Sequence, residues 1–257
     1  MSDLSGKLGL VLGVANKRSI SWAIAQAAAR AGARIALTYP SERLEENVRD
    51  LAATLDNPLV LPCDVTSDEQ IAALAASVDR EFGGLDFVVH GAAFAPAAEL
   101  SNRFIQTSRE GFRMALDISA YSFIALTGAC VPLLDKRGGG SVLTLSHIGS
   151  ERVFPNYNVM GVAKAALEAS VRYLAADLGP QNIRVNAVSA GPIKTLASAG
   201  IPGLSMMLQA QRERAPLRRG MELGEIADAA VFLLSDASRA ITGEVLMVDG
   251  GYHAIGI

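Results

Sequence analysis

The sequence is poor in cysteine and aromatic residues, and it has no block of like charges, internal repeat or low-complexity tract. Its two cysteines, Cys63 and Cys130, stand among apolar neighbours without the spacing of a metal site. This predicts two buried thiols in a reducing compartment and no bound metal. No uninterrupted apolar run approaches the roughly 18 residues that cross a bilayer, and the first apolar run is too short for a signal peptide. We therefore expect a cytoplasmic protein that does not enter a membrane.

The charge balance argues against one class of partner. The 257 residues carry a formal net charge of −3, so the composition gives no reason to expect nucleic acid binding. Hydrophobic residues make up 50% of the chain and glycines number 24, which is typical of a large buried parallel sheet.

Strand-like and helix-like patterns alternate along the whole chain, and no linker rich in proline, glycine or serine divides it. This alternation predicts a single α/β domain over residues 1–257, with a Rossmann-like, doubly wound parallel sheet of about seven strands and helices on both faces. Apolar runs predict the strands at 8–14, 34–39, 59–65, 85–94, 141–146, 183–193 and 244–251. Helical spacing predicts the main helices at 19–33, 42–55, 67–82, 108–134 and 157–178.

In such a sheet, ligands lie beyond the carboxyl ends of the strands, near the point where strand order reverses. Tyr157 and Lys164 follow the strand at 141–146 and stand seven residues apart in a helical pattern. At about 100° per residue they are separated by about 700°, nearly two turns, so both side chains share one helix face. A phenol and an ammonium on one face predict a site that stabilises a developing oxyanion.

The turn after the first strand lacks the usual G-x-G-x-x-G dinucleotide fingerprint. It contains Gly13, and Ser19 follows six residues later at the expected helix start. Free backbone amides at a helix start can bind a pyrophosphate, because the helix dipole favours negative charge there. An ordinary glycine turn with a serine N-cap explains the same pattern.

Five segments together resemble the bacterial NADH-dependent enoyl-[acyl-carrier-protein] reductases, a divergent branch of the short-chain dehydrogenase/reductase superfamily. The spacing Y-x6-K is the most specific feature, since ordinary members of the superfamily use Y-x3-K and Met160 stands four residues before Lys164. The resemblance covers essentially the whole chain. It implies reduction of the double bond of a trans-2-enoyl thioester in fatty acid synthesis. The segments are GVANKRSISWAIA, HGAAFAP, PNYNVMGVAK, VNAVSAGPIKTLAS and ITGEVLMVDGGY.

The resemblance also implies roles for individual residues. Tyr157 would bond the thioester carbonyl, Lys164 would hold the hydroxyls of the nicotinamide ribose, and Ala95 and Met160 would border the substrate. The implied cofactor-binding residues are Gly13, Ser19 and Ile20 at the pyrophosphate, Asp64 and Val65 at the adenine, Ala92 along the cofactor, and Ile193, Lys194 and Thr195 at the nicotinamide and phosphates.

The chain departs from the family pattern at His147, where a second tyrosine normally stands ten residues before Tyr157. His147 as a replacement donor or proton shuttle would make turnover depend on an ionisation between about pH 5.5 and 8. Alternatively, His147 only fills space near the cavity, or it marks a paralogue for another activated alkene or carbonyl, or a cofactor-binding protein without catalysis. Gly91 and Ala92 replace a serine and a bulkier aliphatic residue, which predicts a roomier pocket beside the cofactor.

The residues after the second strand bear on cofactor choice. An acidic group there favours a free ribose hydroxyl and an arginine favours a 2′-phosphate, so Glu42 favours NADH while Arg43 leaves NADPH as the less favoured alternative.

A segment near the C-terminus resembles the mobile substrate lid of the family. It covers about residues 194–214, of which 196–208 are small and apolar, with Gly200 and Gly203 as hinge candidates. An ordinary packed helix with a loop fits the same pattern. Four arginines lie at the end of this segment and just after it, at 212, 214, 218 and 219, and they fit either an acidic carrier protein or a solvated surface. The resemblance further implies a homotetramer.

Overall fold

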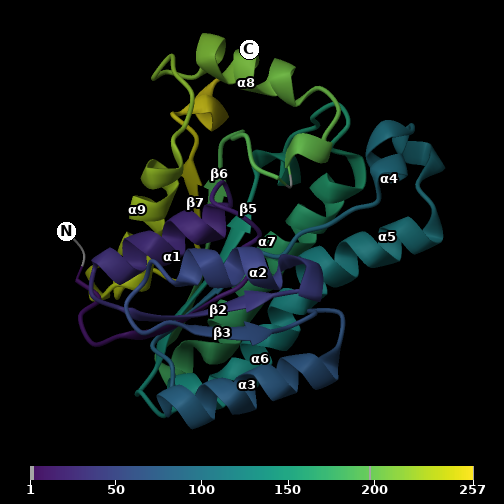
Figure 1. The fold of residues 1–257 in the computed structure, drawn as a ribbon. Coiled ribbons are helices and arrows are strands. Elements are labelled where there is room, and N and C mark those ends of the chain that lie inside the picture. The colour runs from purple at the N-terminus through teal and green to yellow at the C-terminus, as the bar shows by residue number, and fades with distance from the viewer. Residues whose placement is uncertain (1–2, 197, 257) are drawn as a thin grey trace.

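The strands form one parallel sheet, as the sequence predicts. In the computed structural model, which describes residues 3–196 and 198–256, seven strands lie in the order β3-β2-β1-β4-β5-β6-β7. Every neighbouring pair is parallel, and the order reverses between β1 and β4. Figure 1 shows the sheet between its two layers of helices. The strands are β1 (Leu8–Val11), β2 (Arg34–Tyr39), β3 (Leu59–Pro62), β4 (Phe87–His90), β5 (Gly140–Ser146), β6 (Ile183–Ala190) and β7 (Val245–Val248).

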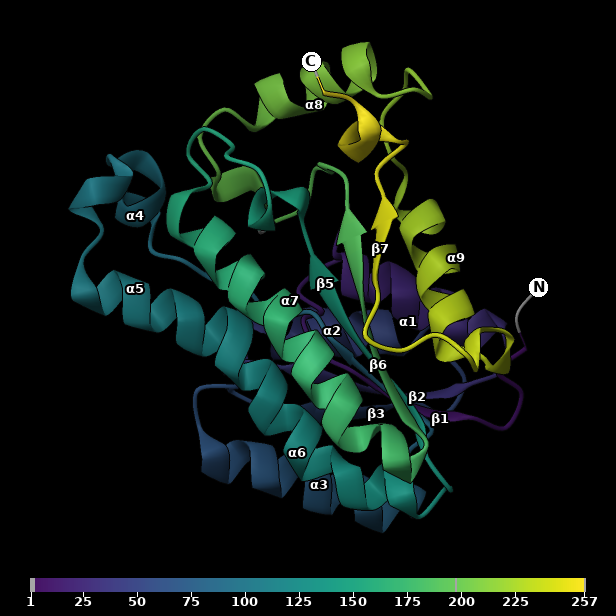
Figure 2. The ribbon, with the colours of Figure 1, turned by 180° about the vertical axis from the view of Figure 1, so that it is seen from behind.

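Helices cover both faces, because parallel strands need long crossover connections. One face carries α1 (Ile20–Arg30), α2 (Glu42–Ala52) and α9 (Leu223–Leu234), and the other carries α3 (Asp68–Phe82), α6 (Ser122–Asp135) and α7 (Asn158–Leu178). Figure 2 shows that α8 (Leu204–Arg214) lies beyond the carboxyl ends of β5, β6 and β7, beside the C-terminal segment.

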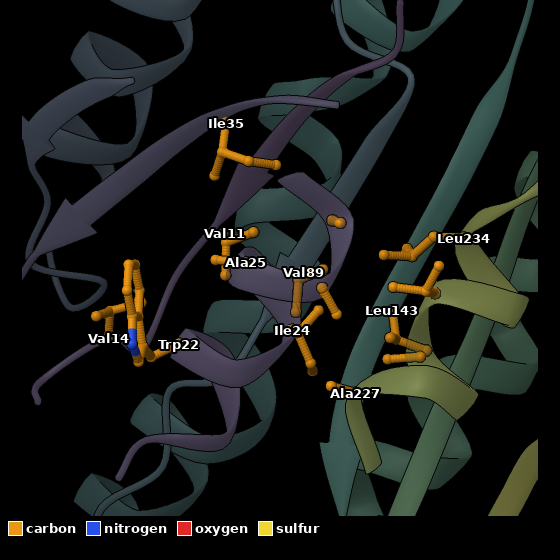
Figure 3. Close-up of a cluster of buried hydrophobic side chains, with 14 of the residues drawn as sticks. Val11, Val14, Trp22, Ile24, Ala25, Ile35, Val89, Leu143, Ala227 and Leu234 are labelled. Carbon is orange, nitrogen blue, oxygen red and sulfur yellow. The ribbon is translucent and has the colours of Figure 1, made fainter. Parts of the chain in front are cut away.

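Alternate residues of each central strand enter two apolar layers. Val11, Val89 and Leu143 face the layer under α1 and α9, where they meet Ile24 and Ala227 (Figure 3). Their strand neighbours enter the layer under α3, α6 and α7, among them Leu10, Val88 and Val142. Since both sides of the sheet are buried, the strands appear in the sequence as continuous apolar runs rather than alternating ones.

The predicted helix over 108–134 is interrupted by one turn of different geometry. The helix α5 (Arg109–Leu116) passes through a π-helical turn at Asp117–Tyr121 before α6 begins. Such turns frequently occur at functional sites. Here the turn buries Ser119, whose hydroxyl accepts a hydrogen bond from the backbone N–H of Phe94 at 3.0 Å. The π-turn therefore holds the segment after β4, which also contains the unpredicted short helix α4 (Ala97–Ser101).

The stretch Arg109–Asp135 is long and apolar enough to cross a membrane by length and composition alone. This stretch contains no uninterrupted apolar run of about 18 residues, because charged residues such as Arg113 and Asp117 interrupt it. In the structure α6 packs against α3 and α7, as a core helix does.

Both cysteines are buried, as predicted. Burial raises the pKa of Cys63 to about 11 and that of Cys130 to about 12, so both thiols stay protonated. They behave as small apolar side chains in the layer under α3 and α6.

Candidate active site

Tyr157 and Lys164 lie at the end of β5 on the buried side of α7. Their side chains are 7% and 6% exposed. Lys164 Nζ donates a hydrogen bond to the backbone carbonyl of Leu145, the penultimate residue of β5, at 2.7 Å. Tyr157 immediately precedes Asn158, the first residue of α7. The pair therefore occupies the carboxyl edge of the sheet, where the sequence predicts a site.

Burial changes the ionisation of both groups. It lowers the pKa of Lys164 to about 8, and the charge of Glu168 opposes this shift. Burial, followed by the charge of Glu168, raises the pKa of Tyr157 well above its usual value of 10.0. Below about pH 8 the site presents a neutral phenol donor beside a cationic ammonium.

His147 packs against two aromatic rings at the end of β5. Its ring centroid lies 4.9 Å from that of Tyr157 and 5.2 Å from that of Phe154. His147 Nδ1 accepts a hydrogen bond from the backbone N–H of Gly149 at 3.0 Å, which assigns the ring proton to Nε2. Burial, and then the charge of Lys164, lower the pKa of His147 to about 4.

The low pKa argues against an ionisation of His147 between about pH 5.5 and 8 in the chain without ligand. The ring is neutral throughout that range, because the charged form is disfavoured by burial and by the nearby ammonium. A neutral imidazole with its proton on Nε2 is a hydrogen-bond donor of fixed charge, as a tyrosine hydroxyl is.

Two asparagines that sequence reasoning did not identify flank Tyr157. Asn156 and Asn158 have φ of 65° and 40°, in the left-handed region that asparagine tolerates better than most residues. Asn158 Nδ2 donates to the carbonyl of Asn102 at 2.9 Å, and Asn156 Nδ2 donates to the carbonyl of Pro202 at 3.1 Å. These bonds fix Tyr157 between the segment after β4 and the segment before α8. The three consecutive residues N-Y-N are the sequence signal that could have indicated this strained turn around Tyr157.

Two glycines let the turn after β5 approach α7. A Cβ on Gly149 would lie 2.4 Å from Cδ1 of Tyr157, and a Cβ on Gly161 would lie 2.7 Å from the carbonyl oxygen of Gly149. Both separations are below normal contact, so any larger residue would move the turn or the Tyr157 ring.

A second pair of glycines brings the turns after β1 and β4 together. Gly13 has φ of +90°, and a Cβ there would lie 2.5 Å from the carbonyl oxygen of Gly91. A Cβ on Gly91 would lie 2.0 Å from Oγ of Ser21. The space that a serine would need at position 91 is filled by Ser21, so the prediction of a roomier pocket is wrong at this position.

Ser19 does not cap α1. Its Oγ accepts hydrogen bonds from the backbone N–H groups of Ala15 and Asn16 at 3.0 and 3.1 Å, and it makes no side-chain bond to the first turn of α1. The amides at the start of α1, including that of Ile20, are left for an anion. The Ser19 hydroxyl also keeps its own proton to donate.

The other predicted cofactor residues all follow strands along the same edge of the sheet. Asp64 and Val65 follow β3, and Ala92 follows β4. The segment 193–195 follows β6, and the Ser198 hydroxyl accepts a hydrogen bond from its last amide at 2.8 Å. The parallel topology therefore gathers these residues around the point where strand order reverses.

A small apolar cluster separate from the two core layers surrounds Tyr157. Its members come from the segment after β4, the turn before α7, α7 itself and the segment before α8. It includes both residues predicted to border the substrate. The cluster consists of Leu100, Tyr157 and Met160, with Ala95, Phe154 and Ile201 packed against it.

Comparison with known proteins decides the family. A sequence model described as enoyl-(acyl carrier protein) reductase matches residues 13–253. The chain is 51% identical over 258 residues to the enoyl-[acyl-carrier-protein] reductase [NADH] of Bacillus cereus, with all of both sequences covered. The chain belongs to the enoyl-[acyl-carrier-protein] reductase family.

Solved structures of enoyl-[acyl-carrier-protein] reductases share the fold closely. The Bacillus cereus enzyme with NADP+ and an indole naphthyridinone superposes with a TM-score of 0.97 at 50% identity, and 100% of both chains is covered. The Anaplasma phagocytophilum enzyme with NAD superposes with a TM-score of 0.95 at 47% identity, and 100% of this chain and 98% of that chain are covered. The resemblance and the doubly wound fold predicted from the sequence are both confirmed.

The close approach at Gly161 leads to a prediction. Gly161→Ala should lower the free energy of unfolding by about 1–3 kcal/mol, because a methyl group cannot fit against the Gly149 carbonyl without backbone movement. Turnover of a 2-enoyl thioester with NADH should fall by about 10- to 100-fold, since the shift displaces Tyr157. Denaturant unfolding and steady-state kinetics measure the two effects.

Gly179→Ala is the matched control, because Gly179 directly follows α7 as its C-cap and an added Cβ there meets no atom within 4 Å. Equal effects of the two substitutions would show that the close approach at Gly161 does not matter.

Proposed function

We propose that this protein reduces the 2,3 double bond of a trans-2-enoyl thioester, carried on acyl carrier protein, in fatty acid synthesis. The observation that carries the proposal is the buried Tyr157–Lys164 pair at the end of β5, at the wide Y-x6-K spacing. Relatives matched over 97–100% of their length and named for this reaction support the substrate class.

NADH is the proposed reductant, and when bound it supplies the hydride. The chain fits a dinucleotide: Gly13 has the positive φ of a tight phosphate-binding turn, and the start of α1 is uncapped. Glu42, exposed at the start of α2, disfavours the 2′-phosphate of NADPH.

Further residues are assigned to this cofactor as part of the proposal. Ser19 and Ile20 would contact the pyrophosphate. Asp64, Val65 and Ala92 would lie along the adenosine half and the cofactor body, and Ile193, Lys194 and Thr195 would hold the nicotinamide end.

Tyr157 is the proposed donor to the thioester carbonyl oxygen. Negative charge develops on this oxygen as the double bond is reduced, and a fixed donor stabilises that charge more than it stabilises the ground state. The raised pKa of Tyr157 keeps its O–H in place for this role.

Lys164 has three N–H donors, of which one is used by the Leu145 carbonyl. The other two suit the hydroxyls of the nicotinamide ribose. His147, neutral with its proton on Nε2, is the proposed second donor near Tyr157.

The segment 194–214 is the proposed substrate lid, residue 197 lying outside the described residues. Only Gln211 is buried among the residues of α8, while Leu196 and Met206 expose apolar surface suited to an acyl chain. Gly203 has φ of +84° at the start of α8, which suits a hinge. The short turn Ser198–Gly200 contains the other hinge candidate.

Self-association into a homotetramer is also proposed. The π-helical turn before α6 exposes Tyr121, and the outer sides of α6 and α7 expose Ile124 and Tyr173, the last 81% accessible. Ile124 and Tyr173 border a groove that also includes Ala169 and Leu174. Contiguous exposed apolar residues of this kind are typical of contacts between subunits. The proposed location is the cytoplasm, which agrees with two free, buried thiols.

The enzyme assay is the first test. Absorbance should show NADH oxidation with a 2-enoyl thioester, faster than with NADPH. Tyr157→Phe should retain NADH binding but turn over about 100-fold more slowly, because it loses the donor to the oxyanion. Turnover of a ketone or cyclic enone but not of the thioester would identify a different reductase. NADH binding with no turnover of any acceptor would identify a protein without catalysis.

The role of His147 gives a second prediction. His147→Tyr should keep turnover, and its pH profile between pH 5.5 and 7 should match that of the wild type, because the pKa of His147 is about 4. His147→Phe should lose about tenfold in turnover, since it retains the ring but not the donor. A wild-type ionisation in this range that disappears in both variants would mean that His147 titrates during catalysis.

Light scattering after size exclusion tests the assembly. The wild type should have four times the mass of one chain, and Ile124→Arg together with Tyr173→Arg should produce smaller species. Val153→Arg, at an apolar residue that is 99% exposed, should leave the mass unchanged. A monomeric wild type at micromolar concentration would overturn the tetramer.

A further inference from the structure

The end of β5 contacts α7 through three consecutive residues. The Leu145 carbonyl accepts the hydrogen bond from Lys164, the Ser146 hydroxyl donates to the Glu168 carboxylate, and the His147 ring packs on Tyr157. Lys164 and Tyr157 already have proposed roles in the site. Glu168, one helical turn after Lys164, has none.

Glu168 is unusual because a carboxylate is seldom buried without a cationic partner in contact. Its side chain belongs to a residue only 5% exposed, and Ser146, also 5% exposed, supplies its hydrogen bond. Residues four apart on a helix lie on the same face. The carboxylate and the Lys164 ammonium therefore share the buried side of α7, where charges interact more strongly than in water.

We propose that Glu168, oriented by Ser146, is a positioning residue that keeps the Lys164 ammonium charged for its role at the cofactor ribose. The proposal rests on the proposed function of Lys164 in NADH binding. Glu168 touches neither substrate nor cofactor in this scheme and acts only through the ammonium.

Among the described residues, the other titratable groups near Lys164 do not supply this negative charge. They are His90 at the end of β4, His147 after β5, and Tyr157 at the start of α7. The pKa of His90 is lowered to about 3 and that of His147 to about 4, chiefly by burial, so both rings are neutral near pH 7. The raised pKa of Tyr157 keeps the phenol neutral as well. Glu168 opposes the loss of the Lys164 proton that burial favours.

The sign of the expected pH effect follows from this arrangement. The pKa of Lys164 lies at about 8, so the ammonium is present below that pH and is lost as the pH rises through it. Removing the Glu168 charge lowers the pKa of Lys164 further. The loss of NADH binding at alkaline pH should therefore begin at a lower pH in the variant.

The test is the dissociation constant of NADH, measured by fluorescence from pH 6 to 9 on the full-length protein. Glu168→Gln keeps the size and the hydrogen-bond acceptor but removes the charge. It should shift the alkaline loss of affinity by about one pH unit toward lower pH, a typical effect of losing one nearby opposite charge. Near pH 6, where Lys164 is protonated in either case, the affinity should recover to within about twofold of the wild type.

Three further variants sharpen the test. Ser146→Ala keeps the charge and loses the hydrogen bond, so it should shift the profile less than Glu168→Gln. Lys164→Met should abolish the loss of NADH affinity at alkaline pH, with or without Glu168→Gln. Glu99→Gln is the matched control, because Glu99 is also buried and accepts a hydrogen bond from a serine hydroxyl, that of Ser108. It should leave the profile unchanged.

Two results would overturn the proposal. One is an affinity that falls equally at every pH in Glu168→Gln, which would indicate a purely structural role. The other is the same shift in Glu99→Gln. Failure of the proposed reaction is detected separately, because the wild type would then bind NADH with the same pH profile yet fail to reduce an enoyl thioester.

Discussion

The docking of α7 on the end of β5 is the constraint on which the site depends. An ammonium and a carboxylate are buried on one side of this helix, and each must find a polar partner because water is excluded there. Lys164 finds a backbone carbonyl of β5 and Glu168 finds the Ser146 hydroxyl. A helix held at these points cannot slide along the strand without leaving a buried charge unpaired. Tyr157, at the start of the same helix, is positioned by the same contacts.

Close backbone approach is the second requirement of the site. Gly13 meets Gly91 across the turns after β1 and β4, and Gly149 meets Gly161 where the turn after β5 reaches α7. In each pair a single added Cβ would come within 3 Å of a backbone oxygen or the Tyr157 ring. These turns lie at the carboxyl edge of the sheet, so the sheet provides rigid strand ends while the glycines let neighbouring loops converge on one point.

The C-terminal segment joins α8 to the rest of the site. Gln211 of α8 donates to the backbone carbonyl of Asp249 at 3.1 Å, and the Asp249 carboxylate bonds the His253 ring at 2.9 Å. Arg152, in the turn after β5, donates to the carbonyl of Ile255 at 2.9 Å. Figure 2 shows this segment beside α8 above the strand ends. His253, for which the sequence suggested no function, is thus part of the structure that supports α8.

The sequence by itself determined the sheet, the helices on its two faces and the shared face of Tyr157 and Lys164, because these follow from local apolar periodicity and helix geometry. The tertiary structure alone decided the rest. The neutral state of His147 depends on burial and on an ammonium from another element, and the partner of Glu168 is a strand residue 22 positions away. Ionisation and close packing depend on groups that the fold brings together, and no local pattern in a single sequence records those distances.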